Sequence, residues 1–257
     1  MSTIIVQVIV GGLLLGAIYA LFSSGLTLVW GMMNIVNFAH GDFVMLGMYV
    51  AFVVWTLFGA GPLLGAPLAA LVLATLGVVV YFGLIREIMK GPMLAQILGT
   101  FGLALLLRYS AFWWFGANFL TLPENIVGGT FDVLGLRIQA SRLLAGGVAL
   151  LVTLGLHLLL TRTSLGSKML AVAEDSTAAQ LMGIRPDSMQ AIAWAIAAGA
   201  TGLAGALIAT FFYIVPTVGE TLAIVAFVTV SLGGFGSVPG ALMAGLLIGV
   251  SSPCPPI

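Results

Sequence analysis

Few residues inside the apolar stretches of this chain have side chains that can take part in chemistry, and Asp42 is one of them. It follows His40 and Gly41 at a point where apolar sequence resumes with Phe43. An aspartate beside a glycine is a good helix N-cap, so Asp42 could accept backbone amides of a helix that starts at Phe43. It could also line a polar pathway, because a charge in apolar surroundings needs a partner or water. Both interpretations of Asp42 are open.

The other reactive side chains do not form a catalytic or metal-binding pattern. His40 and His157 are far apart in the sequence, and Cys254 is the only cysteine. His40 with Asp42 would be the best set for an intramembrane enzyme, but it lacks a second metal ligand and a nucleophile. We therefore expect no catalytic residue, no cofactor and no bound metal, and we expect His40 to be a hydrogen-bonded packing residue.

The longest polar stretch, residues 161–188, contains the signature of a short capped helix. Asp175 suits the N-cap, Gly183 suits the C′ position and Ile184 is the usual apolar follower. Small residues on this helix would let a partner approach closely, with charged residues at the rim. A solvated loop that happens to be capped is the alternative. The candidate docking residues are Ala171, Glu174, Asp175, Ala178, Ala179, Gly183 and Ile184.

A glycine-rich interruption divides the last apolar region, residues 222–250. The sequence from Gly233 to Gly240 has too many helix breakers for one straight helix. We expect two half-length helices around a turn that packs backbone closely or exposes carbonyls to a cavity. No lysine follows the glycines, so nucleotide binding there is not expected. The candidate helix-break or pathway residues are Asn37, His40, Gly41, Asp42, Gly233, Gly234 and Gly236.

Membrane-spanning helices must position these residues. Of 257 residues, 61% are apolar and 6% charged, and the mean hydropathy is +1.23, whereas soluble domains carry roughly 25% charged residues. This composition excludes soluble enzymes and disordered scaffolds, and a net charge of zero offers no basic face for nucleic acid. We expect an all-α fold, a polytopic transmembrane bundle with broken or re-entrant helices, in one domain over residues 1–257.

The expected spans are residues 4–30, a helix restarting after a break at 31–42, and residues 63–85, 93–115, 143–160 and 189–213. The positive-inside rule places two basic connections in the cytoplasm and the N-terminus outside. The loop 117–141 then faces outward, and alternation over residues 128–138 predicts a small hairpin there. Arg108 has no carboxylate nearby in the sequence, so it either snorkels to the membrane surface or pairs across the bundle. The basic residues are Arg86 and Lys90 in one connection, and Arg162, Lys168 and Arg185 in the other.

Five segments together resemble the permease subunits of branched-chain amino acid ABC importers, over nearly all of residues 7–250. They are residues 16–21, 37–42 followed by 45–47, 165–184, 204–207 and 233–237. In that family the inner polar segment is similar to the coupling helix, which docks in a cleft of the cytoplasmic ATPase. The resemblance therefore favours docking over a solvated loop for the capped helix.

The resemblance implies a heteromeric importer in the bacterial cytoplasmic (inner) membrane. Its other parts would be a second related permease subunit, two cytoplasmic ATPase subunits that hydrolyse ATP, and a periplasmic or extracellular substrate-binding protein. Leucine, isoleucine and valine are the leading substrates, and urea or short amides are the alternative. A passive small-solute channel would explain both helix breaks, but it would not explain a capped helix on the inner side.

The final apolar run, residues 241–250, is only about half a membrane crossing long. A proline-rich tail follows it, whereas members of the resembled family continue with further hydrophobic sequence. We expect the sequence to be truncated or frame-shifted after about Val250.

Overall fold

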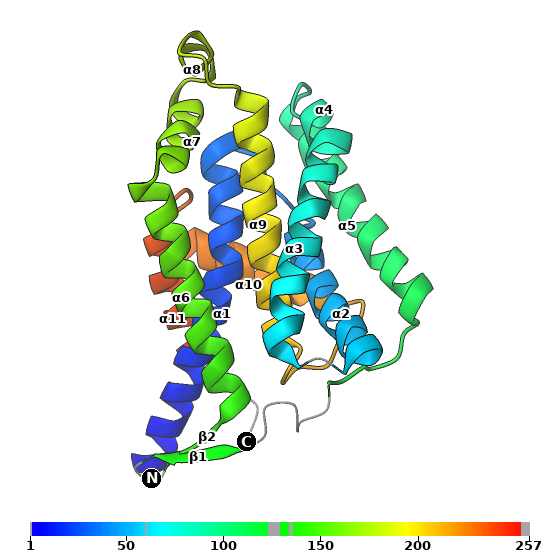
Figure 1. Ribbon diagram of the computed structural model, residues 1–257, viewed down its shortest axis with the longest axis vertical. Coiled ribbons are helices and arrows are strands. Elements are labelled where there is room, and N and C mark those ends of the chain that lie inside the picture. Colours follow the sequence, from blue (N-terminus) through cyan, green and yellow to red (C-terminus); the bar gives the residue numbers. More distant parts are fainter. Residues whose placement is uncertain (1, 60, 123–128, 134–135, 253–257) are drawn as a thin grey trace.

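The computed structural model describes residues 2–59, 61–122, 129–133 and 136–252, which form a bundle of helices with one small hairpin (Figure 1). Six helical spans among these residues are long and apolar enough to cross a membrane. One span joins three elements, because α3 continues through a π-helical turn, η1, into α4. The bounds are α1 Ser2–Met33, α2 His40–Phe58, α3 Pro62–Val80, η1 Tyr81–Ile85, α4 Arg86–Ile88, α5 Met93–Phe115, α6 Ala140–Arg162 and α9 Pro186–Ile208.

The expected spans and the break after the first of them are confirmed, but the end of the last long span is wrong. We expected the last long span to reach Tyr213, but α9 ends at Ile208. The backbone of Ile214 instead exchanges two hydrogen bonds with Leu120, at 2.8 and 3.1 Å. This bridge ties the segment after α9 to the segment after α5, so the chain leaves the helix before Tyr213.

The two basic connections lie at the same end of the bundle, as the sequence predicts. In Figure 1 the short helix α4 and the pair α7 (Ser164–Glu174) and α8 (Ser176–Leu181) stand at one end, and the N-terminus lies at the other. We call the end with α4 and α8 the cytoplasmic end, following the positive-inside rule. There Arg86 forms an ion pair of 2.7 Å with Asp187 on α9.

The predicted hairpin lies beside the N-terminus, at the opposite end (Figure 1). Strands β1 (Thr130–Val133) and β2 (Leu136–Gln139) pair antiparallel, with Thr130 opposite Gln139. Gly128, Leu134 and Gly135, which belong to the predicted segment, lie outside the described residues. The described part confirms the hairpin.

The last apolar region forms two half-length helices, as expected. α10 (Val218–Gly233) and α11 (Val238–Ser251) are bent by 119° at the glycine-rich turn. Gly234 and Gly236 adopt positive φ angles of 87° and 83°, which side chains with a Cβ rarely adopt. The Ser237 hydroxyl caps α11 by accepting the amide of Gly240 at 3.1 Å. The predicted truncation concerns the tail from Pro253 onward, which lies outside the described residues.

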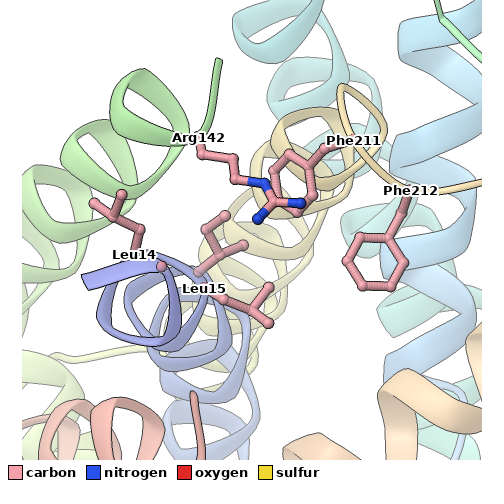
Figure 2. Close-up of a pocket in the computed structure, with 7 residues that line it drawn as sticks. Leu14, Leu15, Arg142, Phe211 and Phe212 are labelled. Carbon is pink, nitrogen blue, oxygen red and sulfur yellow. The ribbon is translucent and has the colours of Figure 1, made fainter. Parts of the chain in front are cut away.

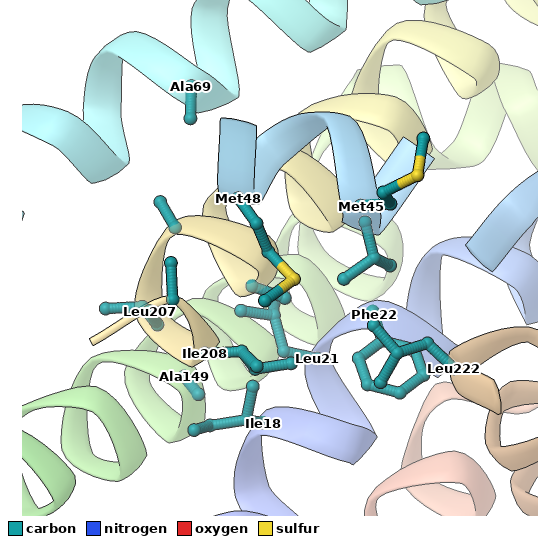
Figure 3. Close-up of a cluster of buried hydrophobic side chains, with 14 of the residues drawn as sticks. Ile18, Leu21, Phe22, Met45, Met48, Ala69, Ala149, Leu207, Ile208 and Leu222 are labelled. Atoms are coloured by element: carbon teal, nitrogen blue, oxygen red, sulfur yellow. The ribbon is translucent and has the colours of Figure 1, made fainter. Parts of the chain in front are cut away.

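The core lies where α9 packs on α1, α2 and α3, and α9 is the most buried of the six spans. Figure 3 shows apolar side chains from α1, α2, α9 and α10 meeting in this core. Close approach depends on small residues: a Cβ added to Gly47 of α2 would lie 2.5 Å from the carbonyl oxygen of Gly202 on α9. Membrane helices commonly associate through such small residues. Figure 3 labels Ile18, Leu21, Phe22, Met45, Met48, Ala69, Ala149, Leu207, Ile208 and Leu222.

Candidate functional site

The connection between α1 and α2 brings Asp42 into the bundle. The Oδ1 atom of Asn37 accepts the amide of Ala39 at 3.1 Å, and α2 begins at His40. The expected N-cap role of Asp42 is therefore wrong, because Asp42 already lies in the first turn of α2. The helix starts earlier than expected because Asn37, rather than Asp42, binds a backbone amide at the break.

Asp42 is engaged instead by Arg108 of α5. Arg108 donates from Nε to Oδ1 of Asp42 at 3.2 Å and from Nη2 to Oδ2 at 3.4 Å. Its third nitrogen, Nη1, donates to Oε1 of Glu220 in the first turn of α10. We call these three residues the ion cluster. Pairing across the bundle is thus the correct alternative for Arg108.

The glycines beside the ion cluster let α10 approach α2. Gly41 lies directly against the carbonyl oxygen of Gly219, and any Cβ there would collide with it. A Cβ on Gly219 would lie 2.7 Å from Oδ1 of Asp42. Helix packing through small residues thereby sets the distance between the two carboxylates that share Arg108.

The ion cluster lies at membrane depth. Arg108 is fifteen residues after Met93 and seven before Phe115, so it is roughly 22 and 10 Å from the two ends of α5 at about 1.5 Å per residue. Thr100, on the same helix, lies 3.0 Å from the carbonyl oxygen of Val36 and anchors α5 to the break. On insertion scales a charge costs roughly 2.5 to 3.5 kcal/mol at the centre of a bilayer and less towards its surfaces, and pairing with Asp42 and Glu220 offsets this cost for Arg108.

The predicted role of His40 is confirmed. Its ring is buried, and Nε2 lies 2.7 Å from the carbonyl oxygen of Phe22, which can only accept. No group of three or more His, Cys, Asp or Glu residues able to hold a metal ion occurs in the part of the chain that the structure describes.

The glycine turn lies at the other end of α10 from Asp42. The Thr27 hydroxyl accepts the amide of Gly236 at 2.8 Å, and a Cβ on Gly31 would lie 3.0 Å from Cα of Gly236. A cavity of about 320 Å³ opens here between α1, α6, α7 and the turn, with Met169 and His157 in its wall. The two predicted groups of break residues are therefore separate, and α10 connects them.

A smaller, almost wholly apolar pocket lies between α1, the start of α6 and the segment after α9 (Figure 2). The guanidinium of Arg142 lies over the ring of Phe211, 5.7 Å from its centroid, with Leu14 and Leu15 beneath it. A cation over an aromatic ring at this distance is a stabilising contact. The pocket offers few polar groups to orient a ligand, so it does not compete with the ion cluster as a site.

The capped helix predicted on the inner side is present as α8. Oδ1 of Asp175 accepts the amides of Thr177 and Ala178 at 2.8 and 3.0 Å. At the other end of α8, Gly183 has a φ of 80°, and its backbone amide donates to the carbonyl oxygen of Gln180. The amide of Ile184 donates to the carbonyl oxygen of Ala179, which completes the Schellman pattern. Both caps are confirmed, and the helix projects beyond the bundle (Figure 1).

The surface of α8 is more apolar than expected. Leu181 is 86% exposed and Met182 is 82% exposed at its tip. Ala178 is exposed, but Ala179 is buried in a cluster with Met169 and Leu28 of the same chain. Ala179 therefore holds α8 onto the subunit, and Ala178 is the small residue that a partner can reach. Ala171 and Ile184 are half-buried, whereas Glu174, Asp175 and Gly183 are exposed.

Sequence reasoning missed three residues. Leu181 and Met182 are apolar residues in a polar stretch, which is a usable signal for an interaction surface. Glu220 is the only acidic residue after Asp187, beside an apolar region, and this isolation could have marked it as the partner of Arg108.

A bundle of broken apolar helices with an ion cluster between them and a projecting capped helix is the architecture expected of a membrane transport subunit. The family follows from comparison with known proteins. The profile described as branched-chain amino acid transport system / permease component matches residues 8–254, and the chain belongs to this family. It is a multi-pass protein of the inner membrane.

Three curated relatives illustrate the similarity. The high-affinity branched-chain amino acid transport system permease protein BraD of Pseudomonas aeruginosa is 32% identical over 95% of this chain and 84% of its own length. LivH of Salmonella typhimurium, which has the same description, is 29% identical over 95% of this chain and 84% of its own length. LivM of that organism is 30% identical over 91% of this chain and 60% of its own length. No solved structure matches the chain at a significant level.

Proposed function

We propose that this chain is one permease subunit of an ATP-driven ABC importer for branched-chain amino acids and forms part of its translocation pathway. The family match over residues 8–254 carries the proposal. BraD and LivH are both named for branched-chain amino acid transport, which favours these substrates over urea or short amides.

The partners follow from the same reasoning. LivH and LivM of Salmonella typhimurium both resemble this chain, which supports a second, related permease subunit beside it. Two ATPase subunits would bind the cytoplasmic end and hydrolyse the ATP, since this chain has no nucleotide-binding motif. A substrate-binding protein would dock at the opposite end, near the hairpin β1–β2.

The coupling surface would be α8 with the end of α7. Leu181 and Met182 are large apolar side chains exposed to water at the cytoplasmic end, and a protein cleft would remove them from water. Ala178 would allow close backbone approach, while Glu174 and Asp175 would lie at the polar rim. A passive channel would need no such surface.

The test changes the volume at one position. Ala178→Trp should prevent docking and lower ATP-driven leucine uptake by about tenfold or more, because an interface core tolerates added volume poorly. Ala178→Ser, which adds one atom, is the matched control and should behave as wild type. Both variants are compared for membrane insertion and for recovery of the ATPase with the subunit. Wild-type uptake by Ala178→Trp would contradict docking through α8.

A further inference from the structure

The ion cluster holds its two carboxylates very differently. Asp42 is 1% exposed and binds Arg108 through both of its oxygens. Glu220 is 61% exposed and binds Arg108 through one oxygen. Asp42 is therefore a fixed counter-ion, whereas Glu220 can leave and return without moving a helix.

The guanidinium of Arg108 binds Asp42 with two of its nitrogens and Glu220 with the third. A guanidinium has five N–H donors, and the two nitrogens that face Asp42 hold it in a bidentate geometry. The nitrogen that faces Glu220, Nη1, can bind any planar carboxylate that takes the place of Glu220. Asp42 would keep the guanidinium oriented during such an exchange.

Glu220 lies in a small exposed polar patch at the start of α10. A carboxylate at membrane depth normally faces a bundle interior or a water-filled cavity. Thr217 and Thr221, on either side of Glu220 along the chain, are also exposed. This polar patch covers the first turn of α10 and ends at the exposed Ile224, one turn after Glu220.

We propose that the ion cluster is the site at which the pathway binds the zwitterionic head of a permeating amino acid. The α-carboxylate of the amino acid takes the place of Glu220 on Nη1 of Arg108, and Glu220 binds the α-ammonium group. Two carboxylates and one guanidinium give the ionised cluster a net charge of −1, and a zwitterion leaves that charge unchanged. The inference rests on the proposed function, because it takes an amino acid as the cargo.

The experiment uses the complete transporter in proteoliposomes with its binding protein and measures leucine accumulated per ATP hydrolysed. Glu220→Gln should lower this ratio by about tenfold, since a neutral amide holds an ammonium group less well than a carboxylate. Glu220→Asp keeps the charge and should stay within about threefold of wild type. Glu87→Gln, which neutralises an exposed carboxylate outside the cluster, is the matched control and should leave the ratio unchanged.

The half-saturating leucine concentration and the recovery of the assembled complex are measured in parallel. Both should stay at wild-type values in Glu220→Gln, because the site acts after delivery of the substrate. A wild-type leucine-to-ATP ratio in Glu220→Gln would overturn the proposal. Loss of the assembled complex would also overturn it, and would assign Glu220 to contact with another subunit. Failure of the wild-type transporter to accumulate leucine would refute the proposed function itself, before any variant is compared.

Discussion

Arg108 should contribute to stability chiefly by compensating the buried charge of Asp42. Arg108→Gln leaves a carboxylate that is 1% exposed without its cation, at membrane depth. Removing one partner of a buried ion pair costs about 3–5 kcal/mol. At about 2–4 °C per kcal/mol for a chain of this size, the unfolding midpoint should fall by roughly 6–20 °C.

The assay is thermal unfolding of the purified subunit in detergent, followed by intrinsic fluorescence and by the loss of a monodisperse species. The double variant Asp42→Asn with Arg108→Gln removes both charges, and it should recover most of the lost stability because two neutral amides remain to bond each other. Lys90→Gln is the matched control. It breaks an ion pair whose side chains are 65% and 63% exposed, and such pairs contribute at most about 1 kcal/mol.

Two results would refute this account of Asp42. One is an equal change of midpoint in Arg108→Gln and Lys90→Gln. The other is a double variant no more stable than Arg108→Gln alone. Either would mean that the carboxylate of Asp42 does not depend on Arg108.

Three further predictions concern packing, capping and orientation. Gly47→Leu should destabilise the subunit by roughly 1–3 kcal/mol, because the new Cβ would lie 2.5 Å from a backbone carbonyl oxygen of α9. Gly155→Ala is the control and should leave the stability unchanged, because no atom lies within 4 Å of its new Cβ. The melting midpoints of the two variants are compared with that of the wild type. Asp175→Ala should cost α8 about 1 kcal/mol and speed deuterium exchange of its amides, because two capping bonds are lost. In a background without the native cysteine, Ser167→Cys should react with an impermeant thiol reagent from the cytoplasm and Thr130→Cys from outside.

Each of these has an outcome that contradicts it. Equal midpoints for the two glycine variants would mean that α2 and α9 are not in close backbone contact. Unchanged deuterium exchange of the α8 amides in Asp175→Ala would mean that Asp175 does not stabilise the start of the helix. Labelling of both cysteines from one side would refute the topology, because α7, which contains Ser167, and β1, which contains Thr130, lie at opposite ends of the bundle (Figure 1).

The sequence by itself determined the features that depend on neighbouring residues. Apolar runs long enough for a bilayer predicted the spans, and the glycines from Gly233 onward predicted a turn between two half-length helices. The angle of 119° between α10 and α11 comes from the structure. The caps of α8 were predicted at Asp175 and Gly183, because a capping side chain and a left-handed glycine act within two or three residues of the helix end.

Only the tertiary structure decided which distant groups meet. Arg108 finds Asp42 across 66 residues and Glu220 across 112, and no local pattern encodes either pairing. The same holds for Ala178 and Ala179, which are adjacent and chemically identical, yet one is exposed and the other is buried against α1 and α7. These outcomes depend on how whole helices pack. Helix packing is in turn set by close backbone contacts between segments that are distant in the sequence, such as the contact of Gly41 with Gly219.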